Sequence, residues 1–175
     1  MKHPSMASLA LTLLLIPAFP GTALAQDTAR AGLSETYGDW QVGCQGNAGT
    51  VICTMAQDVR ASGGTDRLLS ARVDIAERSE PPRLSLIVPL GIDVSIPLEL
   101  FPGTATDPIE SADIRLCQQT GCFAFVQLTP ELLARSYENT AMRVQFTPFR
   151  GEPSEVPLSL RGFEKALERL HALQD

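Results

Sequence analysis

The amino-acid sequence predicts a mainly β fold, an antiparallel β-sandwich or a flattened barrel, with one short helix and one C-terminal helix. The first observation is a series of short runs in which apolar and polar residues alternate, separated by stretches rich in glycine, proline and asparagine. The second is a final stretch whose apolar residues are spaced three and four apart, as on one face of a helix. The chain has 175 residues, which is enough for a leader and one ordinary domain.

Residues 1–25 have the three parts of a secretory signal peptide. Lys2 gives a basic start, residues 7–19 are apolar, and Ala23-Leu24-Ala25 is a small-residue cleavage site. Prolines interrupt the apolar stretch before it reaches the roughly 20 residues that a membrane span needs. We therefore predict cleavage before Gln26 and a periplasmic or secreted protein.

The rest of the chain is predicted to be a flexible lead-in at residues 26–36 and a single domain at residues 37–175. Cleavage changes the formal charge from −6 to −7 and leaves one lysine, Lys165. A domain with so few clustered cations is poorly suited to bind nucleic acid. We expect no transmembrane segment after the leader, and the sequence leaves the oligomeric state open.

The first strands of the domain are predicted from alternation. Residues 37–44 place every second residue from Trp40 on one apolar face. A turn at residues 45–50 leads to a partner strand at residues 51–56, and a further strand is expected at residues 68–75.

Residues 83–103 predict the hairpin around which the sheets are arranged. Apolar residues alternate from Leu84 to Val88 and again after Gly91, which suits a turn with positive φ. Pro97 lies inside the second predicted strand and cannot donate to a ladder of hydrogen bonds. We therefore expect that strand to be an edge or to contain a bulge.

The later segments predict more strands and both helices. We expect strands at residues 113–117, 122–127, 141–146 and 156–160. Thr129 and Pro130 mark the start of a short helix near Glu131. One apolar face of the closing helix is formed by Phe163, Ala166, Leu167 and Leu170. The residues expected in the core are Trp40, Leu86, Val88, Val94, Val144, Phe163, Leu167 and Leu170.

The four cysteines lie in two local pairs, Cys44 with Cys53 and Cys117 with Cys122. An even number of cysteines in an exported chain predicts disulfides, and each pair spans a predicted hairpin turn, which favours local bridges over cross-links. The wide spacing of the first pair does not match a structural zinc site. Thiol exchange would need a C-x-x-C motif, which is absent from the sequence. Redox chemistry and zinc binding are the alternatives to two structural disulfides.

The sequence contains no recognisable catalytic constellation, cofactor motif or metal motif. His171 is the only histidine after the leader, and near the end of a helix a cation interacts favourably with the helix dipole. Asp107, Glu110 and Asp113 are typical of a solvated loop, with a calcium or catalytic role as the alternative. Arginines between residues 60 and 83 alternate with acids, which indicates a surface of mixed charge. We assign no catalytic residue, cofactor or metal ligand.

Four segments in order resemble the invasion-associated locus B (IalB) family of exported bacterial proteins. They are Tyr37-Gly38-Asp39-Trp40 with Cys44 after it, Pro89-Leu90-Gly91-Ile92, the Cys117 to Cys122 element, and Leu158-Ser159-Leu160-Arg161-Gly162-Phe163. The resemblance covers essentially the whole mature chain. It implies a role in host-cell entry, after which the family is named, or a general envelope role, since similar proteins are widespread in bacteria without such a host. It supplies no catalytic residues.

The sequence thus predicts an exported, non-catalytic interaction protein of the cell envelope or surface, and the resemblance adds a role in host-cell association. The expected partner is a protein or another envelope component. The alternative is a periplasmic enzyme acting through carboxylates, because acidic residues are plentiful. A deep pocket with convergent carboxylates would favour the enzyme, whereas an exposed apolar or aromatic patch would favour the interaction protein.

Overall fold

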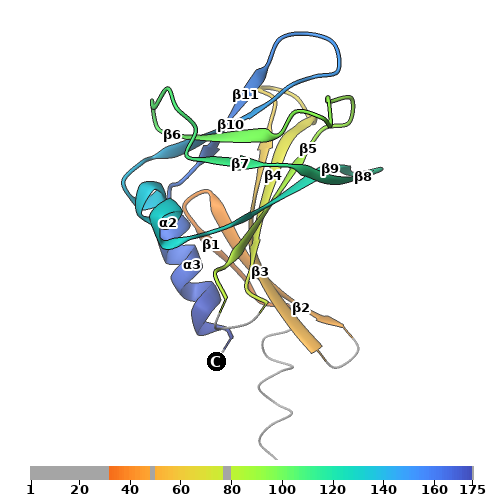
Figure 1. The fold of residues 1–175 in the computed structure, drawn as a ribbon. Coiled ribbons are helices and arrows are strands. Elements are labelled where there is room, and N and C mark those ends of the chain that lie inside the picture. The colour runs from red at the N-terminus through yellow and green to blue at the C-terminus, as the bar shows by residue number, and fades with distance from the viewer. Residues whose placement is uncertain (1–31, 48–49, 77–79, 175) are drawn as a thin grey trace, which may run out of the picture.

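A computed structural model describes residues 32–47, 50–76 and 80–174. Within these residues the chain forms two antiparallel sheets and two helices (Figure 1). The strands are Ser34–Tyr37 (β1), Trp40–Asn47 (β2), Thr50–Arg60 (β3), Arg67–Asp74 (β4), Arg83–Val88 (β5), Leu98–Pro102 (β6), Glu110–Ala112 (β7), Ile114–Gln118 (β8), Gly121–Gln127 (β9), Ala141–Phe146 (β10) and Ser154–Ser159 (β11). The helices are Pro130–Tyr137 (α2) and Phe163–Ala172 (α3).

The two sheets are both open. The larger has the strand order β1-β2-β3-β4-β5-β9-β8 and the smaller has the order β11-β10-β6-β7. Among the described strands the two edges of a sheet do not pair with each other, so the flattened barrel is excluded. The predicted fold of two packed antiparallel sheets with a short helix and a C-terminal helix is confirmed.

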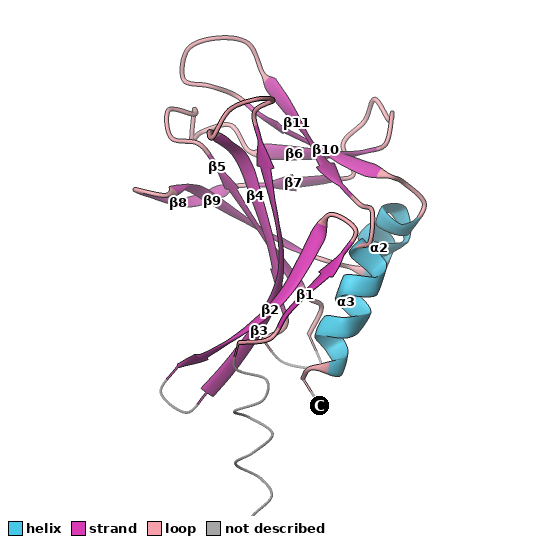
Figure 2. Ribbon diagram, turned by 180° about the vertical axis from the view of Figure 1, so that it is seen from behind, coloured by secondary structure: helices cyan, strands magenta, loops and turns pink. Residues whose placement is uncertain are grey.

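The larger sheet is strongly curved, and helix α3 runs beside its first strands (Figure 2). The helix packs against β1, β2 and β3. Its apolar face is buried as predicted, since Phe163, Ala166, Leu167 and Leu170 are all inaccessible to solvent or nearly so. This burial removes apolar area from water and attaches the end of the domain to its beginning.

The predicted central hairpin is wrong. Strand β5 pairs with β4 and β9 in the larger sheet, whereas β6 pairs with β10 and β7 in the smaller one. Residues 89–97 therefore cross from one sheet to the other. A local turn replaces the expected strand, because the carboxylate of Asp93 accepts hydrogen bonds from the amide and the hydroxyl of Ser95. Pro97 lies just before β6 and not within a strand.

The core lies between the sheets and under helix α3. Seven of the eight residues expected in the core are buried: Trp40, Leu86, Val88, Val144, Phe163, Leu167 and Leu170. Val94 is the exception, with 57% of its surface exposed. It lies in the crossing loop, where the alternating pattern no longer reports a buried face, since the backbone is not extended there.

The first strand begins earlier than expected. Strand β1 starts at Ser34, so the last residues of the segment 26–36 belong to the larger sheet and not to a flexible lead-in. Glu110, expected in a loop, begins the short strand β7, which pairs with β6. The predicted leader, residues 1–25, lies outside the described residues.

Candidate functional site

Two segments far apart in the sequence meet beside helix α3. Residues 37–40 form the turn between β1 and β2, and residues 158–163 lead from β11 into the helix. The amide of Asp39 donates a hydrogen bond to the carbonyl oxygen of Arg161 at 3.0 Å. We call the contact between these two segments the junction. Two of the four segments that resemble the IalB family build it.

An ion pair holds the junction on its exposed side. The guanidinium of Arg161 donates to both carboxylate oxygens of Asp39, at 3.1 and 2.9 Å. The hydroxyl of Ser159 donates to the same carboxylate at 2.5 Å. These hydrogen bonds, first from Arg161 and then from Ser159, lower the pKa of Asp39 below its ordinary value.

Two glycines allow the backbones of the junction to approach closely. Gly162 has a φ of +81°, and a Cβ atom there would lie 2.1 Å from the carbonyl oxygen of Tyr37. Gly38 has a φ of +58°, and its Cβ would lie 2.4 Å from the carbonyl oxygen of Arg161. Both positions therefore exclude a side chain by its size as well as by the backbone conformation.

Aromatic and amide side chains close the buried side of the junction. The rings of Trp40 and Phe163 meet edge to face, with their centroids 5.1 Å apart. The indole N–H of Trp40 donates to the carbonyl oxygen of Ser159 at 2.8 Å. Gln57 donates to the same carbonyl and accepts from the Ser159 amide, at 3.1 and 2.9 Å. The Ser159 backbone is thus fully bonded where it enters the core.

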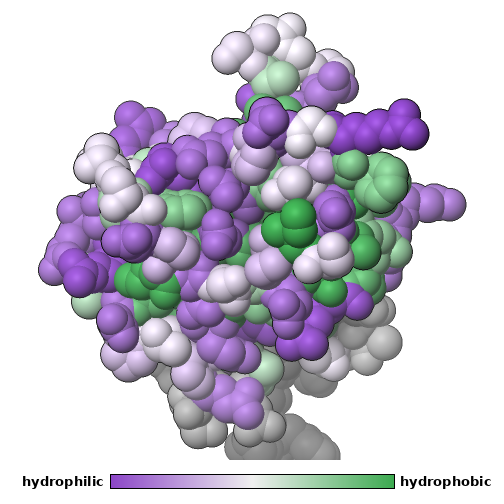
Figure 3. All heavy atoms as spheres, turned by 45° about the horizontal axis from the view of Figure 1, so that its top comes forward, coloured by the Kyte–Doolittle hydropathy of each residue, from purple (hydrophilic) through white to green (hydrophobic). Residues whose placement is uncertain are grey.

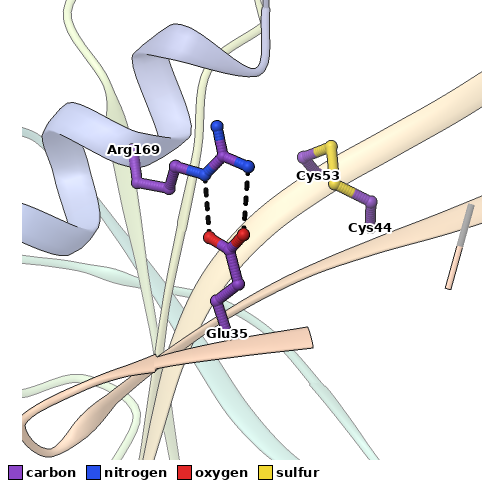
Figure 4. The surroundings of a disulfide bond; sticks show 4 residues. All are labelled: Glu35, Cys44, Cys53 and Arg169. Carbon is purple, nitrogen blue, oxygen red and sulfur yellow. Dashed lines mark hydrogen bonds and ion pairs between the residues drawn. A yellow bond between two sulfur atoms is a disulfide. The ribbon is translucent and has the colours of Figure 1, made fainter. Parts of the chain in front are cut away.

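A second ion pair ties the far end of helix α3 to strand β1. The guanidinium of Arg169 donates to both oxygens of the Glu35 carboxylate, at 2.7 and 3.0 Å (Figure 4). The phenol of Tyr37 donates to Glu35 at 2.9 Å. The hydrogen bond from Arg169, followed by that from Tyr37, lowers the pKa of Glu35, and the bond to Glu35 raises the pKa of the Tyr37 phenol.

An open cleft of about 360 Å³ lies beside the junction. Among the described residues that line it are Tyr37, Tyr137, Asn139, Arg161, Glu164 and Lys165. Glu164 is the only acidic side chain of that lining. The lining of this cleft therefore does not contain the two opposed carboxylates that a glycosidase requires.

The cysteines form the two local disulfides expected from the sequence. Cys44 and Cys53 face each other on β2 and β3, and Cys117 and Cys122 face each other on β8 and β9. The Cα atoms of each pair are 4.0 Å apart. The first bridge lies near the pair of Glu35 and Arg169 (Figure 4), and the second closes an exposed edge hairpin.

The other residues considered from the sequence do not form a metal site among the described residues. His171 is in the last turn of helix α3. In the described ranges no three His, Cys, Asp or Glu side chains are placed to hold a metal ion, and Asp107, Glu110 and Asp113 form no such group. Arg83 pairs with Asp74 at 2.9 Å, as expected for a surface of mixed charge.

Sequence reasoning missed an exposed apolar surface formed by two loops. The loops are residues 89–97, between β5 and β6, and residues 147–153, between β10 and β11. We call their exposed apolar side chains the apolar tip. They are Leu90, Val94, Ile96 and Phe149, with exposed fractions of 56%, 57%, 41% and 72%. Figure 3 shows hydrophobic side chains at the surface of this end of the molecule, among polar ones.

Hydrogen bonds join the two loops of the apolar tip. The amide of Phe149 donates to the carbonyl oxygen of Gly91, and the amide of Asp93 donates to the carbonyl oxygen of Thr147, both at 2.8 Å. Ile92 forms a β-bridge with Pro148, and the Ile92 side chain is buried against the core. The tip is therefore a fixed surface.

The sequence signal that could have indicated the apolar tip is the proline at each end of the loop 89–97, combined with the apolar residues inside that loop.

Comparison with known proteins identifies the class of this fold. The structure resembles the crystal structure of invasion associated protein B from Bartonella henselae, with a TM-score of 0.72 and 27% identity. That match covers 82% of this chain and 97% of the other. The fold is therefore that of an invasion-associated protein.

The family follows from the sequence comparisons. The model of the Invasion associated locus B (IalB) protein family matches residues 40–171. Invasion protein B of Bartonella bacilliformis is 31% identical over 146 residues, 81% of this chain and 76% of the relative. An invasion protein B homolog of Brucella abortus is 27% identical over 174 residues, 99% of each chain. The chain belongs to the IalB family, as the resemblance indicated.

The four segments behind that resemblance have three structural roles. Two of them form the junction. The segment from Cys117 to Cys122 closes the β8–β9 hairpin with a disulfide. The segment from Pro89 to Ile92 begins the first loop of the apolar tip.

The part of the chain that the structure describes contains no helix with the length and hydropathy of a membrane span.

Proposed function

We propose that this protein is an exported, non-catalytic interaction protein of the cell envelope or surface, which contacts its partner through the apolar tip. The observation that carries the proposal is the exposure of Phe149, 72% of whose surface faces solvent from a loop that hydrogen bonds hold in place. Exposed apolar groups that gather on one surface are typical of interaction sites, and aromatic residues contribute strongly to them.

Export is supported by the leader-like residues 1–25 and by the two disulfides, which form in oxidising compartments. The names of the relatives add host-cell association to the proposal. Intact-mass measurement on protein from the periplasm tests the first part. The expected N-terminus is Gln26, and a periplasmic protein that retains residues 1–25 would contradict it.

The main alternative, an enzyme acting through carboxylates, needs a carboxyl group that keeps its proton near neutral pH. The two carboxylates tied to the junction and to helix α3 are poor candidates. Asp39 and Glu35 each accept two hydrogen bonds from an arginine, which lowers their pKa and keeps them ionised. Their pairing supports a structural role for both.

Photo-cross-linking from the apolar tip tests the interaction directly. A benzophenone amino acid replaces Phe149 in the exported protein, and the same amino acid replaces Ile52 as the control. Ile52 is also exposed, at 55%, but lies on the β2–β3 hairpin. We expect protein or lipid adducts in envelope fractions from position 149 and far fewer from position 52. Equal yields, or no adduct from position 149, would contradict the proposal.

A further inference from the structure

We propose that the apolar tip binds a lipid bilayer, inserting its side chains into the interface of a membrane of zwitterionic lipids. This inference rests on the proposed function and names the chemistry of the partner. Phe149, Leu90 and Val94 are each more than half exposed, and they come from two adjoining loops at one end of the sandwich (Figures 1 and 3). An interfacial surface of this kind gains free energy from the apolar area that it transfers into lipid.

The loops are fixed before any contact with a membrane. Two hydrogen bonds of 2.8 Å join them, and the buried Ile92 attaches the first loop to the core. Prolines stand at 89, 97, 148 and 153, at or near the ends of both loops, and restrict their backbone. A surface ordered in advance loses little conformational entropy when it binds.

The form of the tip favours lipid over a protein partner. Its apolar side chains stand on loops, and the clefts beside the junction and beside Arg143 are lined by other residues. A protein partner would need a hole matched to each projecting side chain, as in well-packed interfaces. The acyl and headgroup boundary of a bilayer accepts projecting apolar groups without such matching.

The charges of the tip select the kind of lipid. Only Asp93, Arg150 and Glu152 are charged in the two loops. Asp93 is partly buried, and its carboxylate turns back to accept hydrogen bonds from Ser95. The chain as a whole is acidic, with a formal charge of −6, so an anionic surface repels it. A zwitterionic surface such as phosphatidylcholine imposes no such repulsion.

Tryptophan fluorescence of Phe149→Trp in the mature protein tests insertion. Trp40, the only native tryptophan, is fully buried and gives a constant background. Phosphatidylcholine vesicles should shift the emission of the new indole to the blue, and lipids with brominated acyl chains should quench it. The Ile52→Trp variant is the control and should show neither effect. An unshifted, unquenched Phe149→Trp would overturn the inference.

Co-sedimentation with phosphatidylcholine vesicles measures the affinity. The double variant Val94→Ser/Phe149→Ser should bind at least about tenfold more weakly than the unaltered protein, because burial of apolar groups drives interfacial binding. Ile52→Ser should bind as the unaltered protein does. Thermal unfolding of each variant shows whether it remains folded. If the double variant is unfolded, the single variant Phe149→Ser takes its place in the binding measurement.

The outcomes separate this inference from the proposed function. Protein adducts from position 149 without vesicle binding would overturn the lipid inference and leave the interaction function standing. Neither adducts nor vesicle binding would overturn both. Binding only to vesicles that contain phosphatidylglycerol would overturn the zwitterionic specificity.

Discussion

At the scale of single residues, Gly162 is the position where the junction is least tolerant of change. Its φ is positive, and a Cβ would meet the Tyr37 carbonyl at 2.1 Å. Gly63 has a similar φ of +73°, but nothing lies within 4 Å of its Cβ position. The two glycines therefore separate the cost of the backbone conformation from the cost of a steric clash.

We predict that Gly162→Ala destabilises the protein more than Gly63→Ala does. The Gly63 change should cost about 1 kcal/mol, the usual penalty for a left-handed non-glycine residue. The Gly162 change should exceed that by at least about 1 kcal/mol, because the backbone of the junction must move as well. Urea unfolding of both variants measures the difference. Equal losses would show that the close approach contributes nothing to stability.

The ion pair of Asp39 predicts a pH-dependent contribution to stability. The hydrogen bonds from Arg161 and Ser159 lower the pKa of Asp39 in the folded state below its ordinary 3.8. A lowered folded-state pKa stabilises the fold above the unfolded pKa, and the stabilisation is lost as the pH falls through the folded pKa. Since Arg161 is 72% exposed, solvent screening keeps the contribution small.

Asp39→Asn should therefore lower the free energy of unfolding near neutral pH, and its difference from the unaltered protein should shrink as the pH falls below about 3.8. Unfolding curves from pH 7 to pH 3 measure this, with Asp107→Asn, at an exposed acid in the loop before β7, as the matched control. A difference that grows toward low pH would have the wrong sign for a lowered pKa.

At the scale of elements, the docking of helix α3 depends on Phe163. The ring is 3% exposed and packs edge to face on Trp40. We predict that Phe163→Ala costs about 3–5 kcal/mol, as for other buried aromatic side chains. Lys165→Ala, on the exposed face of the same helix, should change stability by less than about 0.5 kcal/mol. Denaturant unfolding checks both, and a loss below about 1 kcal/mol for Phe163→Ala would mean that the helix is weakly attached.

The sequence predicted most elements because their patterns are local. Helix α3 and the paired strands β8 and β9 each carry a period or a turn that can be recognised within a few residues. The crossing loop 89–97 was mistaken for a strand because its apolar residues alternate in the same way. The strand is interrupted by the Asx turn at Asp93 and by the switch of the chain from the larger sheet to the smaller one. The alternation of apolar and polar residues gives no sign of that switch between sheets.

At the scale of the whole molecule, the candidate sites depend on contacts between distant parts of the chain. Ser159 and Asp39 are separated by 120 residues, and Phe149 stands beside Gly91 only because β6 and β10 pair. Hydrogen bonds between groups so far apart in the chain leave no periodic signal in a sequence. The family resemblance indicated which segments matter, and the structure shows that two of them touch.

The disulfides give the last prediction, which concerns how the whole domain is cross-linked. Each bridge closes a short loop, so each should contribute about 2 kcal/mol on the chain-entropy account of disulfides. The double variant Cys117→Ser/Cys122→Ser should therefore lose about that much stability and stay folded. Denaturant unfolding measures this loss of stability. Selective reduction of the bridge between Cys117 and Cys122 in the unaltered protein should give the same unfolding curve as the double variant.

Peptide mapping without reduction decides the connectivity. Trypsin cleaves after arginine and lysine, so it releases residues 31–60, which contain Cys44 and Cys53, as one peptide. It releases residues 116–135, which contain Cys117 and Cys122, as another. Local pairing therefore leaves two separate peptides, each lighter by two hydrogens than its reduced form, because both cysteines of a pair lie in one peptide. Cross-pairing would join the two peptides into one species. A joined species would show that the two hairpins are bridged to each other, which β2–β3 and β8–β9 could do only by leaving their places in the larger sheet.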